Sequence, residues 1–263
     1  MGAVTLGVIV GNRDFFPDVL VGEARREILK LFTELGIDAV ILDERAAKLG
    51  AVETWEHAKS CAELFRANRD RIAGVVVTLP NFGDEKGVAD TLKLAGLNVP
   101  VLVHAWPDDL DQLHVERRRD AFCGKISVCN NLLQYGIPFS LTEDHTIHPG
   151  AAEFRRDLQE FVAQCRVVGG LRRARIGAVG ARPNAFNTTR YSEKLLQAAG
   201  VSVSTMDLSD LFGRAGRLSD GDAKVRAKLG DVTGYAASAQ VPGSALVRMS
   251  KLAVVLDEWM DAN

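Results

Sequence analysis

The sequence predicts an α/β fold, with a parallel-sheet domain of the flavodoxin or Rossmann type followed by the start of a second α/β domain. Short apolar runs alternate with longer segments whose apolar residues recur at helical spacing. The run Val75, Val76 and Val77 lacks the period-two alternation of a half-exposed strand, which indicates a strand covered on both faces. The strand, loop and helix pattern starts again after Arg173. We therefore place the domains at residues 1–170 and 171–263.

The first elements follow from periodicity and punctuation. We expect a strand at 4–10, a loop at 11–17, and a helix that ends at Gly36, which suits a left-handed C-cap. A short strand at 39–42 follows. The predicted inner face of the helix consists of Val21, Ala24, Ile28, Leu31, Phe32 and Leu35.

The next elements complete a β-α-β-α-β-α-β order. Thr54 can cap a second helix, and the strand at 75–79 stops at Pro80. A third helix ends at Gly96, and a strand covers 100–104. This alternation predicts a parallel sheet with right-handed crossovers. The apolar residues expected on the second helix are Trp55, Ala58, Cys61, Phe65 and Ile72, and those on the third are Val88, Leu92 and Ala95.

A further helix is expected in the segment 122–136. Residues 106–120 before it read as a solvated loop and helix start, although the run Arg117, Arg118 and Arg119 leaves a subunit contact or an anion site open. Uncharged amides and hydroxyls suit hydrogen bonds to sugar hydroxyls, so the helix's polar stripe is a candidate ligand or subunit contact. The predicted packed face is Phe122, Ile126, Cys129 and Leu133, and the polar stripe is Ser127, Asn131 and Gln134 with Asn130 beside them.

The second domain is predicted to contain strands at 174–179 and 201–206. Helices are expected at 188–199 and 207–212. A third helix is expected to begin after Ser219, which can cap it, and a fourth lies at the end of the chain. Two parallel strands do not make a self-sufficient sheet, so we expect this domain to be partial. The apolar face of the last helix is Leu246, Met249, Leu252, Val255, Leu256 and Trp259.

Composition excludes several classes of protein. The net charge of −2 comes from 32 basic and 34 acidic residues that are interspersed, which argues against nucleic-acid or membrane partners. No targeting signal is visible, so we expect a cytoplasmic protein. Neither a GxGxxG fingerprint nor a P-loop follows any strand, which disfavours a nucleotide-dependent enzyme. The four cysteines, Cys61, Cys123, Cys129 and Cys165, form no CxxC pair and read as small buried hydrophobes.

The candidate site lies where the buried strand ends. Ligands of open α/β sheets bind beyond the carboxyl ends of the strands, which makes the loop Asn81, Phe82, Gly83 and Asp84 the first candidate. The pair His145 and His148 does not predict a metal site, because positions three apart on a strand point to opposite faces.

Four segments together resemble the L-fucose isomerase-like family of aldose–ketose sugar isomerases. They are Asn12-Arg-Asp-Phe-Phe-Pro17, Leu79-Pro-Asn-Phe-Gly83, Phe122-Cys-Gly-Lys-Ile-Ser-Val-Cys-Asn130 and Gly180-Ala-Arg-Pro-Asn-Ala-Phe186. The chain is similar to the amino-terminal domain and the first part of the middle domain of that family. The resemblance implies an intramolecular oxidoreductase that works through a metal-bound enediol, usually with Mn²⁺.

The resemblance also implies a homo-oligomer whose active site lies between subunits, with this part covering the sugar. Arg13 matches a position that can donate to sugar hydroxyls, although it could instead pair with Asp14 or cap a neighbouring element. Asn81 and Phe82 are the other implied sugar contacts, with Phe82 as a stacking ring or a core residue, and Asn131 is added from the polar stripe. No catalytic residue or metal ligand of the family can be matched here, and Arg182 receives no role. A non-enzymatic sugar-binding or oligomerisation module remains the alternative.

Overall fold

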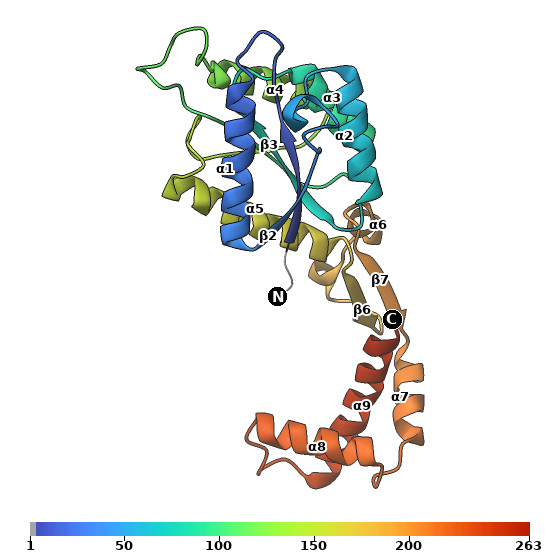
Figure 1. Ribbon diagram of the computed structural model, residues 1–263. Helices are drawn as coiled ribbons and strands as arrows, with labels where there is room; N and C mark the ends of the chain where they lie inside the picture. Colours follow the sequence, from blue (N-terminus) through green and yellow to red (C-terminus); the bar gives the residue numbers. More distant parts are fainter. Residues whose placement is uncertain (1–3) are drawn as a thin grey trace. The chain divides into compact units, whose positions relative to one another are not determined.

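The computed structural model describes residues 4–263, which divide into two compact units. The first unit ends at Gly169 and the second runs from Gly170 to Asn263. Each unit is built on its own parallel sheet (Figure 1).

The first unit contains a five-stranded sheet in the order β2-β1-β3-β4-β5, with every neighbouring pair parallel. This order is that of flavodoxin-like sheets and confirms the predicted fold class. The last strand is very short and was not foreseen. The strands are β1 (Val4–Val10), β2 (Ile37–Ile41), β3 (Ile72–Leu79), β4 (Val101–Ala105) and β5 (Ser140–Leu141).

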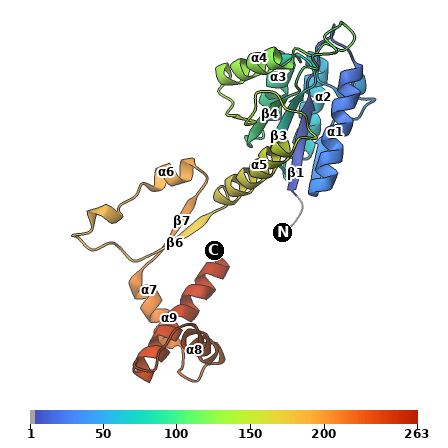
Figure 2. The ribbon, with the colours of Figure 1, turned by 90° about the vertical axis from the view of Figure 1, so that its left-hand side faces the viewer.

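Helices cover both faces of this sheet (Figure 2). Val75 and Val77 of β3 pack into the core on one face, whereas Val76 packs into the core on the other. All three are fully buried, as the unbroken apolar run predicted. One core receives α2 (Trp55–Ala67), α3 (Glu85–Ala95) and α4 (Ala121–Gln134), and the other receives α1 (Val19–Leu35) and α5 (Ala152–Leu171).

The predicted helix ends are confirmed in the first unit. Gly36 and Gly96 adopt left-handed conformations after α1 and α3. Thr54 caps α2, its Oγ1 accepting from the His57 amide at 3.3 Å. Two assignments to α2 were wrong: Ile72 begins β3, and Trp55 is half exposed with Lys86 above its ring. Trp55 is the first residue of α2, and helical periodicity alone does not determine whether a residue in the first turn is buried.

The packed face of α4 also differs from the prediction. Phe122, Ile126 and Leu133 are exposed, and Cys129 is only partly buried. The helix is apolar on two sides, and the side with smaller residues packs inward because backbone from a neighbouring loop approaches it closely. The buried face consists of Ala121, Gly124, Lys125, Val128 and Leu132.

The second unit contains a two-stranded parallel sheet and several helices. Its small core is formed by Met206, Leu211, Ala215 and Val255. The helix predicted at 188–199 is only a 3-10 turn and a short α-helix, and α8 is capped by Asp222 rather than Ser219. Met249, predicted on the packed face of the last helix, is half exposed. The elements are β6 (Arg175–Val179), η2 (Asn187–Thr189), α6 (Glu193–Ala198), β7 (Ser202–Met206), α7 (Leu208–Arg217), α8 (Ala223–Tyr235) and α9 (Gly243–Ala262).

No helix within residues 4–263 is both long and apolar enough to cross a membrane.

Candidate functional site

Two buried asparagines join the carboxyl ends of β1 and β3. The Asn81 Nδ2 donates to Asn12 Oδ1 at 2.6 Å, and the Asn81 Oδ1 accepts from the Gly83 amide at 3.0 Å. Both side chains are completely buried. A buried amide that is hydrogen-bonded in this way fixes the two loops to each other. The geometry therefore favours a positioning role for Asn81, and its predicted contact with sugar remains a prediction.

Arg13 and Phe82 meet on the outer side of these loops. The Arg13 guanidinium carbon lies 4.3 Å from the centroid of the Phe82 ring, which is a cation–π distance. Arg13 forms an ion pair with Glu85, the first residue of α3, rather than with Asp14. Phe16 supports the ring from the β1 loop, at 6.1 Å between centroids. Arg13 and Glu85 are each about a quarter exposed, so this cluster can be reached from solvent.

Gly124 brings α4 into contact with the site loop. A Cβ atom at this position would lie 1.7 Å from the Phe82 carbonyl oxygen, a distance that no side chain can occupy. The helix therefore contacts the site loop only because residue 124 is glycine. This contact explains one residue of the segment 122–130 on which the family resemblance was based.

Arg119 holds the same loop from the other side. Its Nη1 donates to the Pro80 carbonyl oxygen at 2.9 Å, and its guanidinium lies 4.8 Å from the Trp106 ring centroid. Glu23 of α1 lies 3.5 Å from the Arg119 Nη2. Burial lowers the pKa of Arg119, although Glu23 opposes this shift. The sequence left a solvated loop, a subunit contact and an anion site open for the arginine run. Arg119 is not a solvated residue, because it bonds to groups within the first unit.

A buried polar chain lies beneath this clamp. The His104 Nε2 bonds to the Ile147 carbonyl oxygen at 2.7 Å, so it carries the proton, and Nδ1 accepts from Thr78 Oγ1 at 2.9 Å. Thr78 Oγ1 in turn accepts from Trp106 Nε1 at 3.3 Å. Burial lowers the pKa of His104 to about 3, which keeps it neutral. Sequence reasoning missed this chain, since a histidine near the end of a buried strand was the only signal.

Asn131 is not brought to this cluster. It lies seven residues beyond Gly124 on α4, which corresponds to roughly 10 Å along the helix axis. Its Nδ2 donates to the Ser127 carbonyl oxygen at 3.0 Å. The structure therefore groups Arg13, Asn81 and Phe82 together and places Asn131 apart from them.

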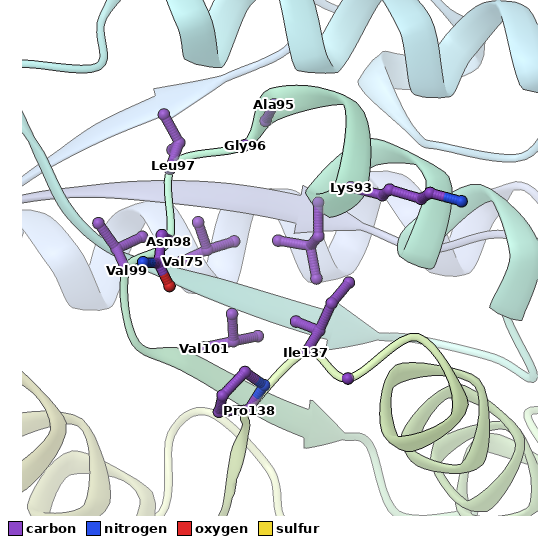
Figure 3. Close-up of a pocket in the computed structure, with 12 residues that line it drawn as sticks. Val75, Lys93, Ala95, Gly96, Leu97, Asn98, Val99, Val101, Ile137 and Pro138 are labelled. Carbon is purple, nitrogen blue, oxygen red and sulfur yellow. The ribbon is translucent and has the colours of Figure 1, made fainter. Parts of the chain in front are cut away.

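A hollow of about 210 Å³ lies at the opposite, amino-terminal edge of the sheet (Figure 3). Its lining is mostly apolar and includes Val75, Val101 and Ile137. The Lys93 amine turns away from it and lies 4.8 Å from the Tyr135 ring centroid. Asn98 is the only uncharged polar side chain among its lining residues, so this hollow offers few groups with which to orient a polar ligand. We therefore place the candidate site at the carboxyl edge.

A manganese centre does not fit the side chains at this edge. Within residues 4–263, no three His, Cys, Asp or Glu side chains are placed to share an ion. Glu85 pairs with Arg13, Glu23 pairs with Arg117, and Asp18 pairs with Lys48 at 2.8 Å. His145 stacks on Phe122, and the His148 Nδ1 accepts from the Gly150 amide at 3.0 Å.

The side chains at the carboxyl edge of the sheet are suited to binding a polar molecule. A guanidinium, a carboxylate and an aromatic ring meet there, and hydroxyl-rich ligands use such groups for hydrogen bonds and stacking.

Comparison with known proteins assigns most of the first unit to a family. The sequence model of the fucose/sulfoquinovose isomerase amino-terminal domain matches residues 7–172, and this range contains the whole carboxyl-edge cluster. No curated protein matches the chain. Since the match spans more than half of the sequence, the chain belongs to the fucose/sulfoquinovose isomerase family through its amino-terminal domain.

Proposed function

We propose that this chain is part of an aldose–ketose sugar isomerase and that its first unit binds and covers the sugar. The observation that carries the proposal is the cluster of Arg13, Phe82 and Glu85 at the carboxyl edge, inside the matched domain. Arg13 has N–H donors beyond the one that Glu85 accepts, and these can bind sugar hydroxyls. Phe82 supplies an apolar surface for the C–H face of the ring.

The side chains at this edge suit orientation of the sugar rather than proton transfer. Isomerisation moves a proton between C1 and C2, and this step requires a base with access to the substrate. Glu85 is held by Arg13, whereas Asp84 caps α3 by accepting from the Gly87 amide at 2.6 Å. We therefore assign no catalytic residue to this edge. Its part is to place hydroxyls, through Arg13, and to exclude water, through the Phe16 and Phe82 rings.

The proposal includes an active site shared between subunits of a cytoplasmic homo-oligomer. Mn²⁺, the ion we expect for this chemistry, would stabilise the developing oxyanion, with ligands from outside the carboxyl edge. The sequence-based alternative, a non-enzymatic sugar-binding module, is favoured by the ion pair that engages Glu85, since sugar can bind there without any reaction.

The test is a titration with fucose and with sulfoquinovose, followed by amide chemical shifts. We expect shifts confined to residues near Arg13 and Phe82, and affinity about tenfold lower in Arg13→Ala because a charged hydrogen bond is lost. The matched control is Arg155→Ala, which removes an exposed ion pair with Glu34 on α1. Equal loss in both variants, or shifts elsewhere, would contradict the assignment of the edge.

Electron paramagnetic resonance of added Mn²⁺, with and without these sugars, separates the enzyme from the binding module. Stoichiometric Mn²⁺ binding that responds to sugar supports an isomerase centre in this chain. Sugar binding with no change in the Mn²⁺ spectrum contradicts a complete isomerase centre within this chain and leaves it the sugar-binding part that both readings share.

A further inference from the structure

The loop after β2 brings a buried carboxylate to the carboxyl edge of the sheet. Val52 extends the end of β1, since its amide donates to the Val10 carbonyl oxygen at 2.8 Å. Glu53 follows directly, and its side chain is only 6% exposed. Within residues 4–263, no group donates a hydrogen bond to the Glu53 Oε1 atom. A buried carboxylate oxygen without a donor destabilises a fold, so its presence requires an explanation.

Lys48 is the cation that lies beside this oxygen. Its Nζ atom is 3.8 Å from the Glu53 Oε1, which is too long for a hydrogen bond, and 2.8 Å from the Asp18 Oδ1. An ammonium group has three N–H donors, so Lys48 keeps donors beyond the one that Asp18 accepts. The Lys48 side chain is 37% exposed, so a ligand can reach it from solvent. Available donors therefore lie next to an acceptor that has no donor.

Lys48 lies next to the loop that carries Arg13. Asp18, which binds Lys48, also accepts from the Asn12 Nδ2 at 3.5 Å, and Asn12 precedes Arg13 in the chain. The pKa of Lys48 is raised, most by the hydrogen bond to Asp18 and also by the charge of Asp14, the residue after Arg13. These contacts join Lys48 to the polar surface on which the Arg13 cluster lies.

The backbone of the loop is strained where it holds Lys48. Leu49 has a φ of 53°, in the left-handed region that leucine rarely adopts, and Gly50 has a φ of 72°. A Cβ atom at residue 50 would lie 2.7 Å from the Leu42 carbonyl oxygen, so the loop requires glycine there. Strained backbone of this kind is concentrated at ligand-binding sites, where the surrounding structure maintains it.

We propose that Lys48 and Glu53 form a second hydroxyl-binding pair of the sugar site, in which one sugar hydroxyl donates to the Glu53 Oε1 and accepts from the Lys48 Nζ. A hydroxyl group is both a donor and an acceptor. Hydrogen bonds of about 2.7 Å and 2.9 Å to the two atoms are compatible with their separation of 3.8 Å. Because the Glu53 Oε1 is buried, entry of the hydroxyl requires a rotation of the flexible Lys48 side chain.

The pair would select sugars by one hydroxyl. A sugar that lacks this hydroxyl leaves both groups without a partner, and buried polar groups that lose their partner discriminate strongly between ligands. The inference rests on the proposed function, because it requires that sugar binds at the carboxyl edge.

A cycle of one change in the protein and one in the sugar tests the pair. Glu53→Met removes the acceptor and should lower the affinity for fucose about tenfold, because a hydrogen bond to a charged group is lost. Among fucose derivatives that each lack one ring hydroxyl, one should bind the wild-type chain about tenfold more weakly than fucose does. Glu53→Met should bind that derivative and fucose equally. The matched control is Glu44→Gln, which changes an exposed carboxylate of the same loop.

Stability distinguishes a binding residue from a structural one. Because the Glu53 Oε1 accepts no hydrogen bond, Glu53→Met should unfold at a denaturant concentration no lower than that of the wild type. A lower midpoint, or fucose affinity equal to that of the wild type, would overturn the inference. The proposed function would still stand if Arg13→Ala weakened binding in the same experiment. A wild-type chain that binds no fucose would overturn both.

Discussion

Two loops in this chain follow the first strand of their sheets in a similar way, yet only one of them forms a defined cluster. After β1, Gly11 is followed two residues later by Arg13, and after β6, Gly180 is followed two residues later by Arg182. Arg13 reaches Glu85 and Phe82, which are about seventy residues away in sequence. Arg182 donates to the carbonyl oxygens of Pro183 and Asn184 in its own loop, at 2.8 Å and 2.9 Å.

The difference lies in what surrounds each loop rather than in its own sequence. The β1 loop is joined to the β3 loop by the buried Asn12–Asn81 pair, and the β3 loop is in turn held by Gly124 and Arg119. In the β6 loop, Arg182 is only partly buried and bonds to carbonyl groups of its own loop. A loop at a strand end becomes a binding surface when buried polar groups and a neighbouring helix fix its backbone.

Gly124→Ala should produce the largest effect. Because the new Cβ would overlap the Phe82 carbonyl oxygen, either α4 or the site loop must move, and we expect unfolding of the first unit to become easier by about 3 kcal/mol. Hydrogen exchange of the β3 amides measures this stability within the first unit.

The control for this variant is Gly230→Ala in α8. No atom lies within 4 Å of a Cβ built at Gly230, so the change should stabilise the second unit by about 0.5–1 kcal/mol. If Gly124→Ala did not lower the stability of the first unit, the close contact between α4 and the site loop would not contribute to that stability.

The buried chain at His104 should make the first unit sensitive to acid. The pKa of His104 is lowered to about 3 in the folded chain, whereas an unfolded histidine titrates near 6.5. The unfolded chain therefore binds the additional proton as pH falls below 6.5, and stability that is fully present above that value is lost toward pH 3. Between pH 7 and 4.5 this loss should be about 2.5 kcal/mol.

The measurement is hydrogen exchange of the β3 and β4 amides as a function of pH, in the wild-type chain and in His104→Gln. The glutamine side chain does not bind a proton in this pH range. The variant should be less stable at pH 7 but should lose less stability on acidification. Parallel pH profiles for the two proteins would show that His104 is not the source.

Much of the first unit could be predicted from sequence because its signals are local. The triple valine predicted a strand covered on both faces, and Gly36, Gly96 and Thr54 marked helix ends that the structure confirms. The candidate loop at 81–84 followed from the rule that ligands of open α/β sheets bind at the carboxyl ends of strands. Each of these signals depends on the chain within a few residues.

The parts that sequence reasoning missed depend on distant neighbours. The apolar residues of α4 satisfy helical spacing on two faces, and only the approach of the Phe82 backbone to Gly124 decides which face packs. Arg119 looked like part of a solvated run, whereas its partners, Pro80 and Glu23, come from other elements. Nothing near His104 in the sequence indicates that it bonds to Thr78.

Asn81→Ala should have a smaller effect than acidification of His104. It leaves the Asn12 Oδ1 and the Gly83 amide buried without their partner, which should cost about 2 kcal/mol. Denaturant unfolding monitored in the first unit measures this loss. Asn81→Asp is a useful companion, because it keeps the acceptor for Gly83 but removes the donor to Asn12. A loss confined to Asn81→Ala would mean that the bond between the two loops contributes little.

The smallest effect is expected at the second loop. Arg182→Ala removes only hydrogen bonds to carbonyl groups that water can reach, so stability should change by less than about 0.5 kcal/mol. Arg13→Ala removes a partly buried ion pair and a ring contact, so it should cost about 1 kcal/mol more than Arg182→Ala. Unfolding each variant in parallel tests the difference. Equal losses would mean that the surroundings of the first loop do not set it apart from the second, because an arginine at either strand end would then be held to the same degree.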